Sequence, residues 1–300
     1  MSANDGSIVG MAKVVDHGPN SRRFNLVILG DGYRSAELDR YRADVQRFLD
    51  TFQTSPPFAD LWSAINVHRV DVASTDSGAA DPATCGDGSA GAGARPRTYF
   101  DATFCGDGAI RRLLTCNSDS AKQVAETQVP EVHLVMVIVN TPLYGGSGGE
   151  VATLSTHPDA TEIALHEMGH TAFGFADEYE SYAGCDSGET GHDHFPGGEP
   201  VEPNVTANAD PSTIKWKAVL SAPSEGLPTT RNADCSRCDR QPNPKPPAFV
   251  GAYEGARYFH CGCYRPSFNC RMRQLGNPFC GVCQQVIRDT LAPYRPDGAS

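Results

Sequence analysis

The sequence predicts an α/β (α+β) fold with a mixed sheet, and two features of the chain indicate it. Strand and helix patterns follow one another in the order strand, helix, strand, strand, helix over about the first 175 residues. The 30 glycines and 22 prolines indicate many turns, whereas 39% hydrophobic residues are enough for a globular core. We expect a loose lead-in at 1–20 and one domain at 21–295, with an N-terminal subdomain at 21–179 and a loop-rich C-terminal subdomain at 180–295.

The first elements follow from hydrophobic periodicity. A short apolar run at 24–29 ends at Gly30-Asp31-Gly32, which predicts a buried strand. Apolar residues recur every three or four positions in 36–52, which predicts an amphipathic helix that Pro56-Pro57 ends. Residues 66–72 alternate between apolar and polar, which indicates a second strand.

The remaining elements are predicted by the same rules. The run at 132–139 is apolar on both faces, so we expect it to be a central strand. The other predictions are a loop at 74–108, a short helix at 109–116, a strand at 150–155, a helix at 161–173, mostly loop at 180–260 and a last helix at 281–292.

The charge balance excludes some classes of partner. Asp and Glu outnumber Lys and Arg by 36 to 25, which gives a formal net charge of −11. Nucleic acids and anionic lipid surfaces both attract basic proteins, so we expect no nucleic-acid partner and no membrane association. The longest apolar run, 132–139, is far shorter than the ~18 residues of a membrane span.

The chain contains 11 cysteines, which is a high number for a cytosolic enzyme. Disulfides persist mainly in oxidising compartments, so the cysteine content favours an extracytoplasmic or secreted location, although the first thirty residues show no signal-peptide pattern. The pairs Cys235-x-x-Cys238 and Cys280-x-x-Cys283 are compatible with disulfides, with a four-cysteine structural zinc site or with free thiols.

The motif that carries chemistry is His166-Glu167-Met168-Gly169-His170, of the form H-E-x-x-H. Histidines four positions apart lie on one face of a helix, where both imidazoles can bind one zinc ion. Glu167 follows the first ligand directly, so its carboxylate can reach a zinc-bound water without binding the metal. This arrangement is typical of zinc peptidases.

A third ligand is expected from the segment after the helix. On a continuous helix Asp177 would lie ~10 Å beyond His170 and could not share its ion. Gly174 allows the helix to end and the chain to turn back, which would bring Asp177 to the metal. Glu178 and Glu180 are alternative ligands. Three protein ligands with one open position define a catalytic zinc site.

The stretch 166–179 resembles the IgA peptidase family of zinc metallopeptidases, whose members share H-E-x-G-H-x-x-x-G-x-x-D-E-Y. The similarity extends over residues 24–290 and includes further segments, which are Leu29-Gly30-Asp31-Gly32-Tyr33, Tyr144 to Gly149, Asn269-Cys270-Arg271-Met272-Arg273 and Phe279-Cys280-Gly281-Val282-Cys283. The resemblance implies a zincin fold with metzincin-like features. It implies that His166, His170 and Asp177 bind zinc and that Glu167 is the general acid/base.

Two further expectations concern the surroundings of the metal. Met272 stands where a metzincin-like Met-turn is expected, although an ordinary core methionine explains it equally well. The glycine-rich stretch before residue 150 suits an edge strand beside the cleft, where an extended substrate can pair.

The resulting hypothesis is a zinc-dependent endopeptidase that acts on protein or peptide substrates with one catalytic zinc ion. Glu167 takes the proton of a zinc-activated water and gives it to the leaving amine. Candidates for the oxyanion donor are Tyr264, Arg273 and Tyr179. The alternatives are a zinc amidase with a non-protein substrate and a zincin-fold binding protein that has lost catalysis.

Overall fold

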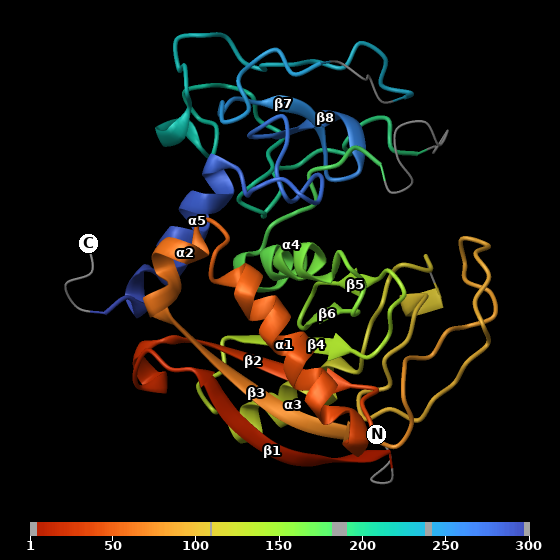
Figure 1. The fold of residues 1–300 in the computed structure, drawn as a ribbon. Helices are drawn as coiled ribbons and strands as arrows, with labels where there is room; N and C mark the ends of the chain where they lie inside the picture. Colours follow the sequence, from red (N-terminus) through yellow and green to blue (C-terminus); the bar gives the residue numbers. More distant parts are fainter. Residues whose placement is uncertain (1–4, 109, 182–190, 238–241, 297–300) are drawn as a thin grey trace. The chain divides into compact units, whose positions relative to one another are not determined.

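The chain folds into two compact units in a computed structural model, which describes residues 5–108, 110–181, 191–237 and 242–296. The first unit comprises Met1–Ala172 together with Leu291–Ser300, and the second comprises Phe173–Thr290. Figure 1 shows the elements of both units, which are described separately below. Among the described residues, no helix has the length and apolar character needed to cross a membrane.

A six-stranded mixed sheet forms the first unit, so the predicted mixed α/β class is confirmed. Its strand order is β1-β3-β2-β4-β6-β5, with the inner strands parallel and both outer strands, β1 and β5, antiparallel to their neighbours. The strands are β1 (Gly6–Val15), β2 (Phe24–Asp31), β3 (Ile65–Ser74), β4 (Leu134–Val139), β5 (Gly146–Ser147) and β6 (Ala152–Leu154).

Helices cover the two faces of this sheet. Figure 1 shows α1 in front of the sheet and α3 behind it. Val27 and Leu29 of β2 pack in one apolar cluster with Val124 of α3, while the alternate residues of β2 point to the opposite face. The helices are α1 (Leu38–Phe52), α2 (Phe58–Leu61), α3 (Ser118–Gln128) and α4 (Ala160–Phe173), the last of which ends at the first residue of the second unit.

Most elements with a strong hydrophobic period lie where the sequence predicts them. The strand predicted at 24–29 is β2, the helix at 36–52 is α1 and the strand at 66–72 is β3. The apolar run at 132–139 is β4, which lies between β2 and β6 as a central strand. The strand at 150–155 and the helix at 161–173 correspond to β6 and α4.

Two predictions in the first unit are wrong. Residues 6–15 are not a loose lead-in, because they form β1 along the edge of the sheet and pair with β3. Residues 110–116 are not helical, since Thr115 exchanges backbone hydrogen bonds of 2.9 Å with Thr103 instead. The helix follows later as α3, where the side chain of Asn117 accepts a hydrogen bond from the Ser120 amide at 3.0 Å.

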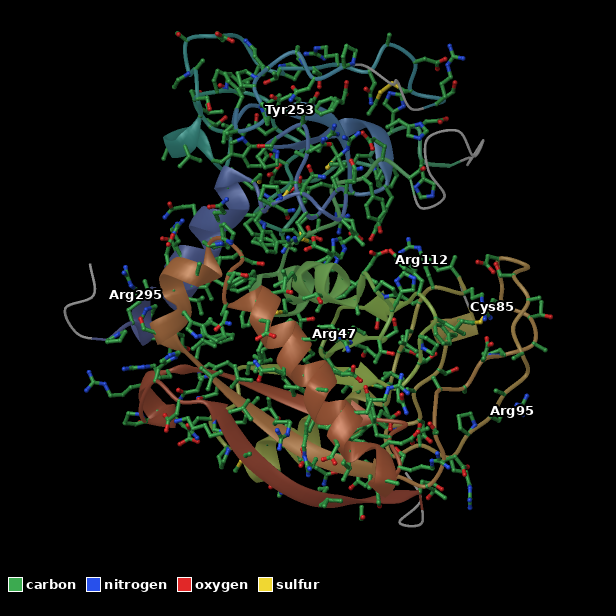
Figure 2. The ribbon with its side chains drawn as sticks, in the orientation of Figure 1. Arg47, Cys85, Arg95, Arg112, Tyr253 and Arg295 are labelled. Atoms are coloured by element: carbon green, nitrogen blue, oxygen red, sulfur yellow. A yellow bond between two sulfur atoms is a disulfide. The ribbon has the colours of Figure 1, made fainter. Side chains whose placement is uncertain are left out.

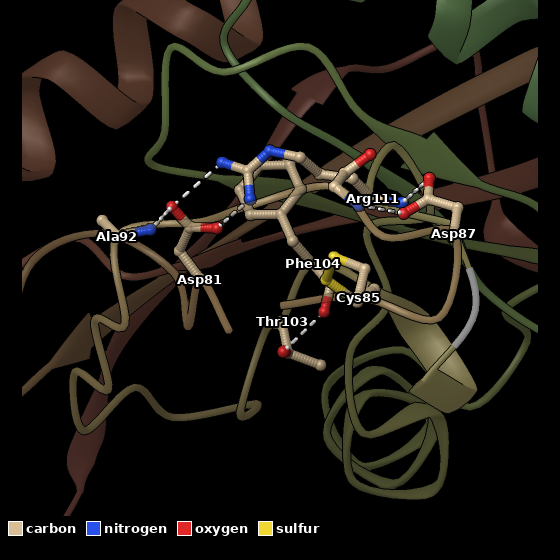
Figure 3. Close-up of a disulfide and its surroundings, with 9 residues drawn as sticks. Asp81, Cys85, Asp87, Ala92, Thr103, Phe104 and Arg111 are labelled. Atoms are coloured by element: carbon tan, nitrogen blue, oxygen red, sulfur yellow. Dashed lines mark hydrogen bonds and ion pairs between the residues drawn. A yellow bond between two sulfur atoms is a disulfide. The ribbon is translucent and has the colours of Figure 1, made fainter. Parts of the chain in front are cut away.

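The long loop before α3 is held together by side chains, as Figure 3 shows. A disulfide joins Cys85 to Cys105. Arg111 forms an ion pair with Asp81, and its backbone amide donates to the Asp87 carboxylate at 3.1 Å. These contacts fix the segment 75–108, which contains no strand or α-helix among its described residues, so the predicted loop at 74–108 is confirmed except for Ser74, the last residue of β3.

The second unit consists mainly of loops, as predicted, but it also contains a hairpin that the sequence pattern does not predict. Strands β7 (Tyr253–Ala256) and β8 (Phe259–Arg265) pair antiparallel, and the two residues between them, Arg257 and Tyr258, have positive φ angles of 54° and 72°. The predicted last helix is α5 (Gly281–Leu291), and a second disulfide joins Cys235 to Cys261. Cys238 lies outside the described residues.

Candidate metal centre

Helix α4 brings the two predicted histidine ligands together in the first unit. The Nε2 atoms of His166 and His170 lie 3.1 Å apart, and both side chains are half-buried. Two nitrogens at tetrahedral positions on one zinc ion would be about 3.3 Å apart, so the pair is spaced for a shared ion. The helix is held in this rotation by its buried apolar residues, Ile163, Leu165 and Met168.

Glycines of the stretch around β5 lie directly against this pair and against Glu167. A Cβ atom on Gly148 would lie 2.7 Å from the Cβ of His170 and 2.9 Å from Oε2 of Glu167. A Cβ on Gly146 would lie 3.6 Å from Oε1 of Glu167. The absence of side chains at these positions therefore lets the backbone run close to the candidate general base.

Strand β5 is the outermost strand of the sheet, yet part of its outer edge is already paired. The amide of Gly146 donates to the carbonyl of Arg112 at 3.2 Å, and the amide of Leu114 donates to Gly146 at 3.4 Å. The hydroxyl of Ser147 also donates to the carbonyl of Leu114 at 2.7 Å. Arg112, which Figure 2 labels, lies in the loop before α3. Pairing of an extended substrate with this stretch stays a prediction.

The second unit begins at the end of α4, where Gly174 adopts a φ angle of +64°. This left-handed conformation favours glycine and turns the chain out of the helix, as the sequence predicts. The next segment is fixed by the fully buried Asn204. Its side chain accepts from the amide of Ala176 at 2.8 Å and donates to the carbonyl of the same residue at 2.9 Å.

Asp177 is held by the tip of the β7–β8 hairpin. Its carbonyl accepts a hydrogen bond from the amide of Arg257 at 3.0 Å, and its Oδ2 accepts one from the hydroxyl of Tyr258. The side chain is 6% exposed. No motif in the sequence marks Tyr258, because its role depends on a hairpin within a segment predicted to be loop.

The two alternative ligands have other partners within the second unit. Glu180 accepts a hydrogen bond from Arg273 at 2.9 Å and forms an ion pair with Arg265 at 3.2 Å. Burial acts to raise the pKa of Glu180, but the two guanidinium groups lower it below its usual value. Glu178 is fully buried, and its Oε1 accepts from Asn204 at 2.9 Å.

Met272 lies next to the segment of the predicted third ligand. Its side chain is fully buried, and its carbonyl accepts a hydrogen bond from the amide of Glu178 at 2.7 Å. Of the predicted oxyanion donors, Arg273 also donates to Oδ1 of Asn269 at 2.7 Å. Tyr264 is a buried residue of β8, and burial followed by the charge of Glu254 raises its pKa.

A comparison with protein-family models decides the family. The model of the IgA Peptidase M64 family matches residues 12–242 and 240–291, which together are most of the chain. The chain belongs to this family. It is therefore a peptidase, a hydrolase that acts on peptide bonds of proteins or peptides, and its family is one of metallopeptidases. A comparison with curated proteins found no match.

Proposed function

We propose that this M64 peptidase is a zinc-dependent endopeptidase with one catalytic zinc ion bound by His166, His170 and Asp177. The observation that carries the proposal is the 3.1 Å separation of the two imidazole Nε2 atoms on α4. The turn at Gly174 and the position of Asp177 shortly after the helix support Asp177 as the third ligand. Two imidazoles and one carboxylate are a donor set that zinc prefers, and three ligands leave a position for the reaction.

The hydrogen bonds of Asp177 support its assignment as the third ligand. Metal-binding carboxylates are usually fixed by hydrogen bonds from neighbouring groups, which set their orientation and their affinity for the ion. Asp177 has such partners on its carbonyl and on its carboxylate, from Arg257 and Tyr258. The alternatives Glu178 and Glu180 are engaged by Asn204 and by two arginines.

The proposed mechanism assigns proton transfer to Glu167. When bound, zinc supplies Lewis-acid polarisation of the scissile carbonyl and lowers the pKa of water. The carboxylate of Glu167 takes the proton of the attacking water and delivers it to the leaving amine. Gly146 and Gly148 leave the space beside this carboxylate free of side-chain atoms of their own.

We further propose that the fold is of the zincin type with metzincin-like features. The mixed sheet with a motif-bearing helix after β6 supports this proposal. The backbone bond from Glu178 to Met272 supports a Met-turn beside the ligand segment. Family membership does not favour the two other functions, an amidase with a non-protein substrate or a binding protein without catalysis.

The test is the variant Glu167→Gln, compared with Glu162→Gln five residues earlier on the same helix. We expect the first variant to keep its zinc and to lose casein and peptide hydrolysis by at least about 100-fold, because it lacks the general base. The second variant should stay active. Retained hydrolysis in Glu167→Gln would overturn the mechanism, and activity only on non-peptide amides would favour the amidase.

We also propose an extracytoplasmic location. Two described disulfides, Cys85–Cys105 and Cys235–Cys261, support it, because such bonds persist mainly in oxidising compartments. Fractionation of the native cells and antibody detection of the protein would test it. Recovery with cytosolic markers alone would contradict it.

A further inference from the structure

The second unit contains a compact group of four buried residues that the proposed catalytic centre does not use. Glu178, Cys270, Cys280 and Cys283 each direct one ligand atom into the group, and these atoms all lie within 4.8 Å of one another. All four side chains are buried. None of the three cysteines takes part in a described disulfide.

The distances within the group fit a tetrahedral metal site. The Sγ atoms of Cys270 and Cys283 are 3.8 Å apart, and Sγ of Cys283 lies 3.7 Å from Oε1 of Glu178. Two thiolates bound to one zinc ion at ~2.3 Å would be about 3.8 Å apart at tetrahedral angles, and a thiolate and a carboxylate oxygen about 3.5 Å apart. A disulfide would require ~2.05 Å between the sulfurs.

The buried carboxylate of Glu178 also indicates that a cation binds in this group. Oε2 of Glu178 is buried and has no hydrogen-bond partner among the described residues. Buried polar atoms are almost always satisfied, and a buried carboxylate needs a counter-charge.

The local backbone favours thiolates at this position. Cys280 immediately precedes α5, and Cys283 lies in its first turn, where the partial positive charge of the helix N-terminus favours an anion. The amide of Cys280 donates to Sγ of Cys270 at 3.2 Å, which is the kind of hydrogen bond that orients a ligand sulfur.

We propose that Glu178, Cys270, Cys280 and Cys283 form a closed structural zinc site. Four protein ligands leave no position for water or substrate, which distinguishes a structural site from a catalytic one. The site would tie three segments together, namely the stretch that carries Asp177, the turn at Met272 and the start of α5. The proposal is independent of the catalytic centre and replaces the four-cysteine site considered from sequence, because Cys235 is bonded to Cys261.

The test is the zinc content of the purified full chain, measured by elemental mass spectrometry. We expect two zinc ions per chain in the wild type and one in the double variant His166→Ala/His170→Ala. Addition of Cys283→Ser to the double variant should lower the content to zero. Addition of Cys263→Ser, which replaces another buried thiol of the second unit outside the group, should leave it at one.

A second experiment, which is spectroscopic, tests the proposal if Cys283→Ser does not fold. The double-histidine variant reconstituted with Co²⁺ should show thiolate-to-cobalt charge-transfer absorption, and iodoacetamide should modify Cys270, Cys280 and Cys283 only after a chelator is added. Any of three results would overturn the structural site. These are the absence of zinc from the double-histidine variant, immediate alkylation of the three thiols, and a disulfide between two of them. Failure of the catalytic centre would instead appear as equal zinc content in the wild type and the double-histidine variant.

Discussion

The hydroxyl of Tyr258 donates a hydrogen bond to Oδ2 of Asp177 from the tip of the β7–β8 hairpin. This bond orients the carboxylate that we propose as the third zinc ligand. We expect Tyr258→Phe to weaken zinc binding at the catalytic centre about 10–100-fold, because loss of an outer hydrogen-bond partner costs that much in comparable metal sites. Competition titration with a zinc-binding dye would measure the change.

A matched control for this experiment is Tyr253→Phe, in the first position of β7. Figure 2 labels this residue, which is buried in the second unit. Removal of its hydroxyl should leave zinc affinity within about twofold of the wild type, because no ligand assignment involves it. Equal losses in both variants would mean that Tyr258 acts through the stability of the hairpin and not through Asp177.

The close approach of Gly148 to α4 predicts a strong effect of a single methyl group. In Gly148→Ala the new Cβ would lie 2.7 Å from the Cβ of His170, so either the helix or the β5 segment must shift. We expect kcat/KM to fall about 100-fold, as misplacements of about 1 Å do in active sites. Gly10→Ala in β1, where a Cβ meets nothing within 4 Å, should be neutral. Similar kcat/KM values for the two variants would contradict this prediction.

The buried ion pairs of Glu180 predict a pH-dependent contribution to stability. Arg265 and Arg273 lower the pKa of Glu180 despite its burial, so the ionised carboxylate stabilises the fold above its unfolded pKa. This contribution is lost as the pH falls through the lowered folded-state value. We expect Glu180→Gln to lower the free energy of unfolding by about 3 kcal/mol at pH 7, because it leaves the buried Arg265 and the half-buried Arg273 without this carboxylate.

Urea unfolding of Glu180→Gln and the wild type between pH 7 and pH 3 would measure this effect. The difference between the two proteins should shrink below about pH 4, where an ordinary glutamate becomes protonated. A difference that stays constant over this range would show that Glu180 acts through packing and not through its charge.

The disulfide in the loop before α3 predicts a local loss of stability on its removal. Cys85 and Cys105 are separated by 20 positions, and cross-linking a loop of this size stabilises a fold by about 3 kcal/mol in the chain-entropy model. The double variant Cys85→Ser/Cys105→Ser should therefore unfold at lower urea concentration while zinc content is unchanged. Loss of zinc together with stability would show that the loop also supports the catalytic centre.

The sequence predicts those elements whose side-chain period decides their structure. Helix α1 has a continuous apolar face, and β4 is apolar on both faces because it is a central strand with α1 packed on one face of the sheet and α3 on the other. The histidines of α4 are also predictable, since the helix alone sets their spacing. Gly174 ends the helix as expected from its conformational freedom.

The elements that the sequence does not predict depend on tertiary partners. Strand β1 has two glycines, and its apolar residues are exposed or only half-buried, so no regular period marks it as a strand; it pairs along the open edge of β3. Helix α3 has only a weak apolar face, and its start depends on the Asn117 cap. The group around Glu178 joins residues from two distant parts of the sequence, so the C-x-x-C spacing alone could not reveal which residues accompany Cys280 and Cys283.

The short turn between β7 and β8 has a consequence for how this enzyme can vary. Surface turns usually accept insertions and deletions, but both residues of this turn bond to the segment that contains Asp177 and Tyr179. A change in turn length would move these bonds out of register. Homologues that retain the same third ligand should therefore keep a two-residue turn here, even where the surrounding loops differ greatly in length.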